Sequence, residues 1–303
     1  MKIRLLAPDS KIPNQAIMKI STYHKRKGDD VAWFNEDLDF ADTDILYISK
    51  VFTFSKLEIP NLWNDCKIII GGTGYDITSK LPDEIESITE LDYSLYPDCD
   101  YSIIFTTRGC IRKCPFCIVN KKEGPIHNVP ICELNPKGKW IMLLDNNFFG
   151  NPTWRKNIEI IKGFEQPIDY NCGIDLRILT EEQCKALAST KIKSLKCAFD
   201  NYEDKDIILP KLKMLTEYIS PYKIVCYVLV GFKQKHLVEE DIWRVNKIWE
   251  LGVYPYVMVY QDFNNPNYER DITTKQFARW CNNRFIFKSC SWEEYKSTRN
   301  GKV

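Results

Sequence analysis

The sequence holds 303 residues, with 42 lysines and arginines against 41 aspartates and glutamates, and this length suffices for two ordinary domains. The balanced charge gives no sign of a nucleic-acid or anionic-membrane partner, and no apolar run approaches membrane-spanning length. The opening Met-Lys-Ile-Arg-Leu-Leu is typical of a strand rather than of a signal peptide. We therefore expect a cytoplasmic protein whose 12 cysteines are reduced.

The first 80 residues alternate between strand and helix patterns. Residues 2–7, 31–34, 44–51 and 67–70 are predicted strands, and residues 15–27 carry apolar side chains at helical spacing. Alternation of this kind predicts a parallel sheet covered by helices, in a small Rossmann-like or flavodoxin-like domain over residues 1–80.

The last of these strands runs into Gly71-Gly72-Thr73-Gly74. A glycine-rich turn at the carboxyl end of a strand lets the backbone approach a ligand closely. It serves equally well as a tight connection between strand and loop, so both interpretations remain open.

Residues 81–100 are rich in Pro, Asp, Glu and Tyr and show no periodicity, which predicts a linker. Six further strands are predicted at residues 101–106, 140–144, 168–174, 194–199, 223–230 and 253–260. Helical patterns lie between them, near residues 154–164, 181–188, 212–219 and 239–251. Residues 101–262 are therefore predicted to form six strand–helix units, and residues 263–303 a C-terminal extension with a helix at 277–283 and an aromatic-rich tail.

Three cysteines, Cys110, Cys114 and Cys117, follow the first of these strands in Thr-Thr-Arg-Gly-Cys-Ile-Arg-Lys-Cys-Pro-Phe-Cys. Three thiolates this close can hold three irons of a 4Fe–4S cluster and leave the fourth iron open to a chelating ligand. The alternatives are a zinc knuckle or three buried thiols. Zinc prefers four ligands in paired arrangements, and no fourth Cys or His follows at such a spacing.

The motif resembles the signature of the radical S-adenosylmethionine (SAM) superfamily, because a glycine precedes the first cysteine and the aromatic Phe116 precedes the third. The resemblance implies a partial (β/α)6 barrel of the TIM type over residues 101–262, with SAM bound at the open iron. It also implies reductive cleavage of SAM to a 5′-deoxyadenosyl radical that abstracts hydrogen from the substrate, with flavodoxin or ferredoxin as electron donor. The remaining alternative outside catalysis is an iron–sulfur or SAM-binding sensor.

The resemblance also implies where SAM would lie. The segment Asp145-Asn146-Asn147, after the second barrel strand, would contact the SAM amino group, although short polar residues also form local turns here. Arg177, after the third strand, suits a carboxylate because its fork offers two parallel donors. A structural ion pair with Asp175 is the alternative for Arg177.

The later strand ends complete the implied cofactor site. Asp200 would meet the ribose or methionyl part of SAM, Gly231 would let the adenine pack closely, and Val259 would contact the adenine through its backbone. Cys172, in the third strand, is expected to be a packing residue, although a thiol can pass a radical. The histidines His24, His127 and His236 share no motif, and we expect solvated or capping roles for them.

The first domain resembles the cobalamin-binding domains that precede many such barrels. Ser49 and Gly71-Gly72 match two marks of those domains, but Pro8-Asp9-Ser10-Lys11-Ile12-Pro13-Asn14 stands where they supply a histidine to cobalt. We therefore expect no bound cobalamin, with a cobalamin-dependent radical methyltransferase as the alternative. The substrate is left open between a peptide, a nucleoside and a small metabolite.

Overall fold

The computed structural model describes residues 1–10, 12–62, 65–262, 265 and 267–300, apart from the side chains of Cys172, Arg299 and Asn300. The protein is mixed α/β with two parallel sheets, as predicted at this level. It forms two compact units: unit 1 comprises Met1–Lys113 and Cys117–Leu144, and unit 2 comprises Cys114–Phe116 and Asp145–Val303. The predicted domain limits at residues 80, 100 and 262 stay predictions.

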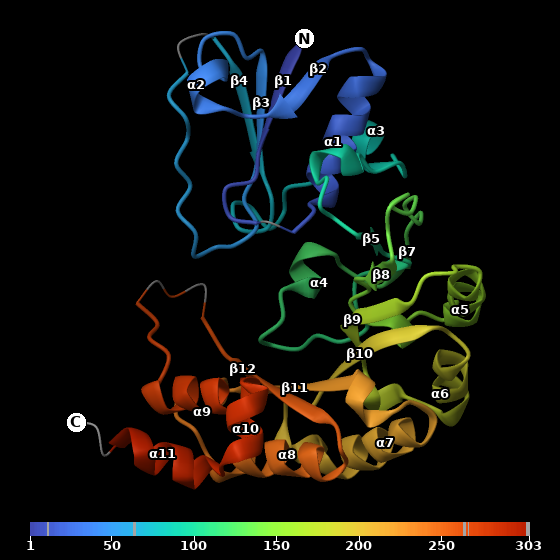
Figure 1. Cartoon of the computed structure of the whole chain (residues 1–303), viewed down its shortest axis with the longest axis vertical. Helices are drawn as coiled ribbons and strands as arrows, with labels where there is room; N and C mark the ends of the chain where they lie inside the picture. Colours follow the sequence, from blue (N-terminus) through green and yellow to red (C-terminus); the bar gives the residue numbers. More distant parts are fainter. Residues whose placement is uncertain (11, 63–64, 263–264, 266, 301–303) are drawn as a thin grey trace. The chain divides into compact units, whose positions relative to one another are not determined.

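Unit 1 contains a four-stranded sheet in the order β2-β1-β3-β4 (Figure 1). Its parallel strands are β1 (Lys2–Leu6), β2 (Asp30–Trp33), β3 (Ile45–Ser49) and β4 (Lys67–Gly71), each within two residues of its predicted range. Alternation turns Ile3 and Leu5 of β1 to one face, where they pack against Ile17 and Ile20 of α1 (Gln15–Arg26). A short helix, α2 (Glu36–Asp39), follows β2.

The predicted linker, residues 81–100, packs against α1. It contains α3 (Asp83–Glu86) and the 3-10 turn η1 (Tyr93–Leu95). Ile85 is 2% exposed, and the ammonium group of Lys19 on α1 donates to the carbonyl oxygen of Glu86 at 2.5 Å. These contacts make the segment a packed part of unit 1.

The second sheet has the order β12-β11-β10-β9-β8-β5, so its strands follow one another in chain order. They are β5 (Tyr101–Ile104), β8 (Trp140–Leu143), β9 (Ile168–Ile174), β10 (Ile192–Ala198), β11 (Ile224–Val230) and β12 (Tyr254–Val259). All six were predicted, to within two residues at each end. Between β5 and β8 lie the antiparallel pair β6 (Thr107–Arg108) and β7 (His127–Asn128) and the helix α4 (Val119–Lys122).

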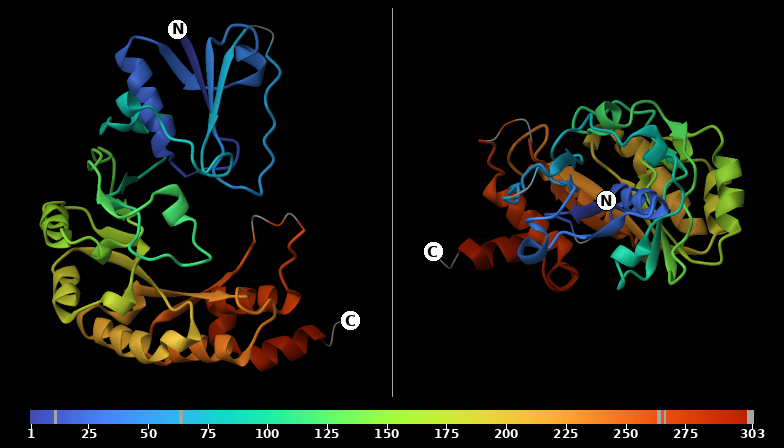
Figure 2. Two further views of the ribbon diagram at one scale, coloured as in Figure 1. Left: turned by 180° about the vertical axis from the view of Figure 1, so that it is seen from behind. Right: turned by 90° about the horizontal axis from the view of Figure 1, so that it is seen from above.

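Helices of unit 2 cover one side of strands β9 to β12 (Figure 1, Figure 2). They are α5 (Trp154–Lys162), α6 (Glu181–Ala188), α7 (Lys205–Tyr218) and α8 (Glu239–Glu250), with 3-10 turns η2 (Phe148–Gly150), η3 (Leu176–Ile178), η4 (Tyr202–Asp204) and η5 (Pro221–Lys223). Helix α7 begins at Lys205 rather than near residue 212, because burial of Ile208 and Leu212 carries it through Pro210.

The C-terminal extension closes the edge of β12. It forms α9 (Ile272–Asn282), which contains most of the predicted helix, α10 (Arg284–Ser289) and α11 (Trp292–Asn300). The side chain of Asn282 accepts the N–H of Val257 at 2.7 Å and donates to its carbonyl oxygen at 2.9 Å, so it replaces a neighbouring strand at this edge. Residues 263, 264, 266 and 301–303 of the extension lie outside the described residues.

His24 departs from its expected solvated or capping role. It is 5% exposed, its Nδ1 lies 2.7 Å from Asp29 and its Nε2 lies 3.1 Å from the hydroxyl of Tyr47. That expectation was wrong for His24, whose side chain is part of a buried hydrogen-bond network. Across the described part of the chain, no helix combines the length and apolarity needed to cross a bilayer.

Candidate functional site

The cysteine loop begins at a position that requires glycine. Gly109 has a φ of +83°, and a Cβ atom there would lie 2.4 Å from the carbonyl oxygen of Pro125 and 2.7 Å from that of Gly124. The pairing of β6 with β7 holds these two stretches of backbone together. Cys110 is therefore anchored at the base of a tight, locally defined turn.

The three thiols of the motif are half-buried and free of disulfides. The backbone N–H of Arg112 donates to Sγ of Cys110 at 3.3 Å, and hydrogen bonds to sulfur tune cluster-bound thiolates in iron–sulfur proteins. Among the described residues, no three Cys, His, Asp or Glu side chains are gathered at metal-binding distance. The motif nevertheless supplies three thiols, the donor type that a 4Fe–4S cluster requires, and Cys110, Cys114 and Cys117 would hold it.

The side chains after β8 are buried in unit 2. Asp145 and Asn147 are 2% and 3% exposed, and Asn146 is half-buried. Oδ1 of Asn147 accepts the N–H of Gly150 at 3.1 Å, which is the local turn considered from the sequence. Nδ2 of Asn147 also donates to Asp175 at 3.3 Å, so this side chain links the ends of two successive strands.

Arg177 follows β9 and forms the ion pair considered from the sequence. Its Nε donates to Asp175 at 2.8 Å, and its Nη1 lies 3.8 Å from Asp204. Burial of the guanidinium is the largest influence and lowers the pKa of Arg177, but the bond to Asp175 and the charges of Asp175, Cys114 and Asp204 together raise it. Arg177 is thus fixed as a cation close to one cysteine of the motif, and all of these groups belong to unit 2.

Asp200 follows β10, where burial raises the pKa of its carboxyl group. The charge of Arg244, the N–H of Leu229 and the charge of Arg177 act in the opposite direction. Asn147, Arg177 and Asp200, predicted from three different strands, therefore lie in one hydrogen-bonded and electrostatic network within unit 2.

Arg244, on α8, is a member of this network that the sequence analysis missed. It is 3% exposed, and its guanidinium donates to the carbonyl oxygens of Phe199 and Leu229. The sequence contained one signal for its burial, which is helical spacing. Asp241 and Arg244 fall on the same face of α8 as the buried Val245 and Ile248.

A series of aromatic rings joins the cysteine loop to the ends of β11 and β12. The ring of Phe116 lies 5.3 Å from that of Phe232, which lies 4.9 Å from Tyr260, and Tyr260 lies 5.7 Å from Tyr268. The hydroxyl of Tyr268 donates to the carbonyl oxygen of Gly231 at 3.3 Å. Phe116 is therefore connected to Gly231 through three edge-to-face ring contacts and a final hydrogen bond from Tyr268.

Gly231 has a φ of +80° and turns the chain away from β11. Val259 ends the neighbouring strand β12 and is half-buried, and the N–H of the next residue, Tyr260, donates to the carbonyl oxygen of Val230 at 2.9 Å. The side chain of Cys172, in β9, lies outside the described part of the chain.

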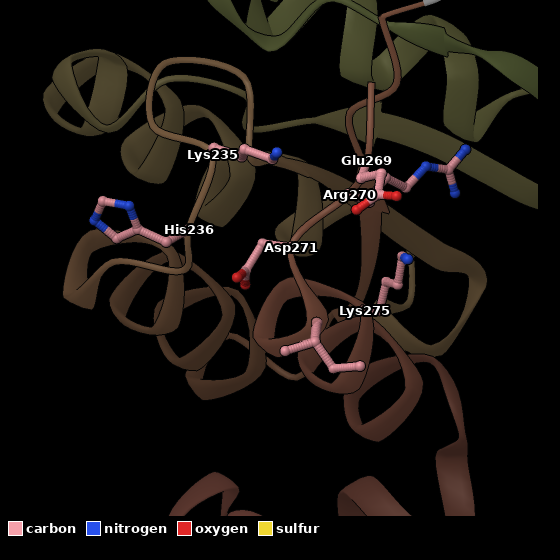
Figure 3. A pocket seen from close by; sticks show the side chains of 7 residues that line it. Lys235, His236, Glu269, Arg270, Asp271 and Lys275 are labelled. Atoms are coloured by element: carbon pink, nitrogen blue, oxygen red, sulfur yellow. The ribbon is translucent and has the colours of Figure 1, made fainter. Parts of the chain in front are cut away.

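A pocket of about 540 Å³ lies between the loop after β11 and the start of α9 (Figure 3). Its charged side chains are of both signs and include Lys235, His236, Glu269, Arg270, Asp271 and Lys275. No predicted site residue lines it. Because its lysines are exposed, it is a solvated, mixed-charge surface next to the strand ends rather than the predicted site itself.

The carboxyl end of the unit 1 sheet is filled by the chain's own groups. The carboxylate of Asp9 accepts the N–H of Phe52 at 2.8 Å. A Cβ atom on Gly72 would lie 2.2 Å from the carbonyl oxygen of Lys50, and one on Gly74 would lie 2.5 Å from the carbonyl group of Phe52. The glycine-rich turn therefore allows two backbone segments to pack together, which is the second of its two interpretations.

This end of the sheet does not fit cobalamin. Ser49, one of the two matching marks, accepts a hydrogen bond from Asn14 at 2.8 Å, and Asp9 is bonded to the loop after β3. The segment after β1 thus supplies an aspartate and an asparagine to internal bonds, and no histidine for cobalt.

Comparison with models of known protein families and with curated protein sequences gives no match.

Proposed function

We propose that this chain is a radical SAM enzyme. The observation that carries the proposal is the Gly-Cys-x-x-x-Cys-x-Phe-Cys loop, which follows β5, the first strand of a sheet whose strands run in chain order. In strand–helix repeats of this kind, binding and catalytic residues collect at the carboxyl ends of the strands. The chemistry of three thiols and the position of their loop therefore point to the same end of the sheet.

The fold supports the finer architecture that the proposal requires. Six strands in sequential order, with helices on one side of β9 to β12, are consistent with a partial (β/α)6 barrel of the TIM type. The order β2-β1-β3-β4 in unit 1 is consistent with a Rossmann-like or flavodoxin-like domain. In such domains the chain places one strand on one side of β1 and the following strands on the other side, as β2 and β3 are placed here.

A cluster held by Cys110, Cys114 and Cys117 would supply the one-electron reductive cleavage of SAM to a 5′-deoxyadenosyl radical, which abstracts hydrogen from the substrate. The chain's own residues bind and orient SAM. Asp145, Asn146 and Asn147 offer oxygen acceptors to its ammonium group. Arg177 is held by Asp175 through Nε and meets the carboxylate with its outer nitrogens.

The remaining strand ends hold the nucleoside. Asp200 accepts the ribose hydroxyls, Gly231 leaves room for the adenine, and the backbone at Val259 contacts the base. Phe116 packs on Phe232 and so ties the cysteine loop to this part of unit 2. A cytoplasmic flavodoxin or ferredoxin supplies the electron.

The test is anaerobic. The protein is reconstituted with iron and sulfide, reduced with dithionite and given SAM, and 5′-deoxyadenosine is measured by chromatography. We expect the nucleoside from wild type and from Cys290→Ala, a half-buried cysteine outside the motif, and none from Cys110→Ala. A well-formed cluster without SAM cleavage would overturn the catalytic proposal and favour a sensor.

A further inference from the structure

Arg244 is a buried cation that binds the ends of two strands. It lies on α8 and is 3% exposed. Its Nη1 donates to the carbonyl oxygen of Phe199 at 2.5 Å and its Nη2 to that of Leu229 at 2.8 Å. Phe199 directly follows β10 and precedes Asp200, and Leu229 is the second-last residue of β11. One side chain therefore binds the carboxyl ends of both strands, just beyond the point where their backbone pairing ends.

The same guanidinium is held from its own helix. Asp241, one turn earlier on α8 and 6% exposed, accepts a hydrogen bond from Nη2 at 2.6 Å. Nε of Arg244, however, is buried and has no hydrogen-bond partner among the described residues. A buried ion pair with an unsatisfied N–H contributes little to stability. An apolar side chain of similar volume would avoid both the desolvation of the charges and the loss of that hydrogen bond. Its geometry is instead suited to joining two carbonyl groups with a rigid, planar fork.

The charge of Arg244 acts on Asp200, which follows directly after one of the bound carbonyls. Asp200 is surrounded by Arg244 from α8, Arg177 from η3, Asp204 from η4 and Cys226 from β11. Arg244 exerts the largest of the charge effects that favour the carboxylate over the neutral acid. A carboxylate accepts hydrogen bonds through both oxygens, whereas the protonated acid loses part of that capacity.

We propose that Arg244 is a positioning residue, which fixes the ends of β10 and β11 and holds Asp200 as the ionised acceptor for the ribose hydroxyls of SAM. The inference rests on the proposed function and adds to it a residue that does not contact SAM. It explains why a cation is buried in α8 next to these two strand ends.

The experiment measures SAM binding without turnover. The reconstituted protein is kept anaerobic without reductant, and its affinity for labelled SAM is measured by equilibrium dialysis between pH 6 and pH 8.5. The variants are Arg244→Gln, which removes the charge, and Arg244→Lys, which keeps the charge but cannot span both carbonyls. Lys247→Gln, a half-buried position on the same helix whose side chain pairs with Glu250, is the matched control. Thermal unfolding of every variant reports whether it folds.

We expect Arg244→Gln to bind SAM at least about tenfold more weakly at pH 6.5, as when a supporting partner is removed from a ligand site. Because the charge of Arg244 lowers the pKa of Asp200, its removal raises that pKa, and the pH below which binding falls moves upward. Arg244→Lys keeps the pH dependence of wild type but binds more weakly at every pH. Asp200→Asn binds weakly with no such pH dependence.

A loss of affinity in Arg244→Gln that is the same at all pH values would overturn the proposal, because a purely structural role predicts that result. Unchanged affinity in Arg244→Gln would overturn it as well. If wild type binds no SAM, the proposed function fails and this inference fails with it. If wild type binds SAM and the pH dependence of Arg244→Gln is the same as that of wild type, only the inference fails.

Discussion

The carboxyl ends of the two sheets are built in opposite ways. In unit 1, backbone packs against backbone, because Gly72 and Gly74 lie against residues 50–52. The carboxylate of Asp9 accepts hydrogen bonds from N–H groups of that same segment after β3. In unit 2, side chains from successive strand ends meet one another, through Asn147, Asp175 and Arg177. Both sheets are parallel and both end in polar residues, so the architecture alone does not distinguish them.

The difference teaches what separates a closed strand end from one able to bind a ligand. Glycines that lack a side chain let the chain fill the space itself, whereas side chains that meet at the strand ends place polar groups there. Substitutions at the carboxyl end of the four-stranded sheet should therefore change stability, and substitutions at the strand ends of unit 2 should change SAM binding.

The largest effect is expected from Gly72→Ala in unit 1. Its φ of +96° is strained for alanine, and the new Cβ would meet the carbonyl oxygen of Lys50 at 2.2 Å, so we expect a loss of about 3 kcal/mol in the free energy of unfolding. Gly28→Ala is the matched control, with a φ of +79° and no atom within 4 Å of the new Cβ, and should lose only about 1 kcal/mol. Urea unfolding measures both, and equal losses would contradict the backbone closure of unit 1.

Arg177→Lys is expected to change binding rather than stability. Lysine keeps the charge but loses the fork that bonds Asp175 through Nε, so we expect SAM affinity to fall about tenfold, or about 1.4 kcal/mol. Arg155→Lys, which alters an exposed two-bond pair with Glu182, should leave affinity unchanged. Equilibrium dialysis distinguishes them, and equal affinities in the two variants would remove Arg177 from the site.

Asp9→Asn should destabilise unit 1 by about 1 kcal/mol at neutral pH without changing SAM affinity. Burial is the largest influence and raises the pKa of Asp9, but hydrogen bonds from Ser55, Val51 and Phe52 together lower it below the usual range. The carboxylate therefore contributes stability above its unfolded pKa of about 3.9, and this contribution is lost as pH falls through the lower folded value. Unfolding curves of wild type and variant should converge on acidification, and a constant difference would refute the role of the charge.

The smallest effect is expected from Phe116→Leu. Loss of the edge-to-face contact with Phe232 should cost about 0.5 kcal/mol in the docking of the cysteine loop, seen as faster loss of iron to a chelator. Phe54→Leu in unit 1 is the control, since Phe54 is 72% exposed and stacks only on Phe52 among the described aromatic rings. Equal rates of iron loss in the two variants would show that Phe116 does not anchor the loop.

Much of the fold could be predicted because it is encoded locally. The ten strands of the two parallel sheets carry short apolar runs bounded by Gly, Pro and polar residues, and α1 and α8 carry apolar residues at helical spacing. The start of α7 was missed because Pro210 suggests a helix boundary, which packing of Ile208 and Leu212 overrides. The packed state of residues 81–100 was missed because isolated apolar residues such as Ile85 and Leu91 show no periodicity, and their partners on α1 are distant in sequence.

The site could be predicted only in part. The cysteine spacing and the polar residues after each strand are visible in the chain, because strand ends are marked by a change from apolar to polar residues. Asp241 and Arg244 are on a helix, 41 and 44 residues beyond Asp200, and no local pattern connects them to it. His24 likewise lies in an ordinary amphipathic helix, and its burial depends on Asp29 and Tyr47 from other elements.

By itself, the sequence determined the order of the strands and helices, the donor atoms of the cysteine loop and the candidate residues at the strand ends. Those features depend on side-chain chemistry and short-range periodicity. Only the tertiary structure decided that the glycine-rich turn packs on residues 50–52, that Arg177 pairs with Asp175 and that Arg244 binds two strand ends. The first and third of these depend on distances between segments far apart in the chain, which arise when the sheets and helices pack, and the second on the local turn after β9.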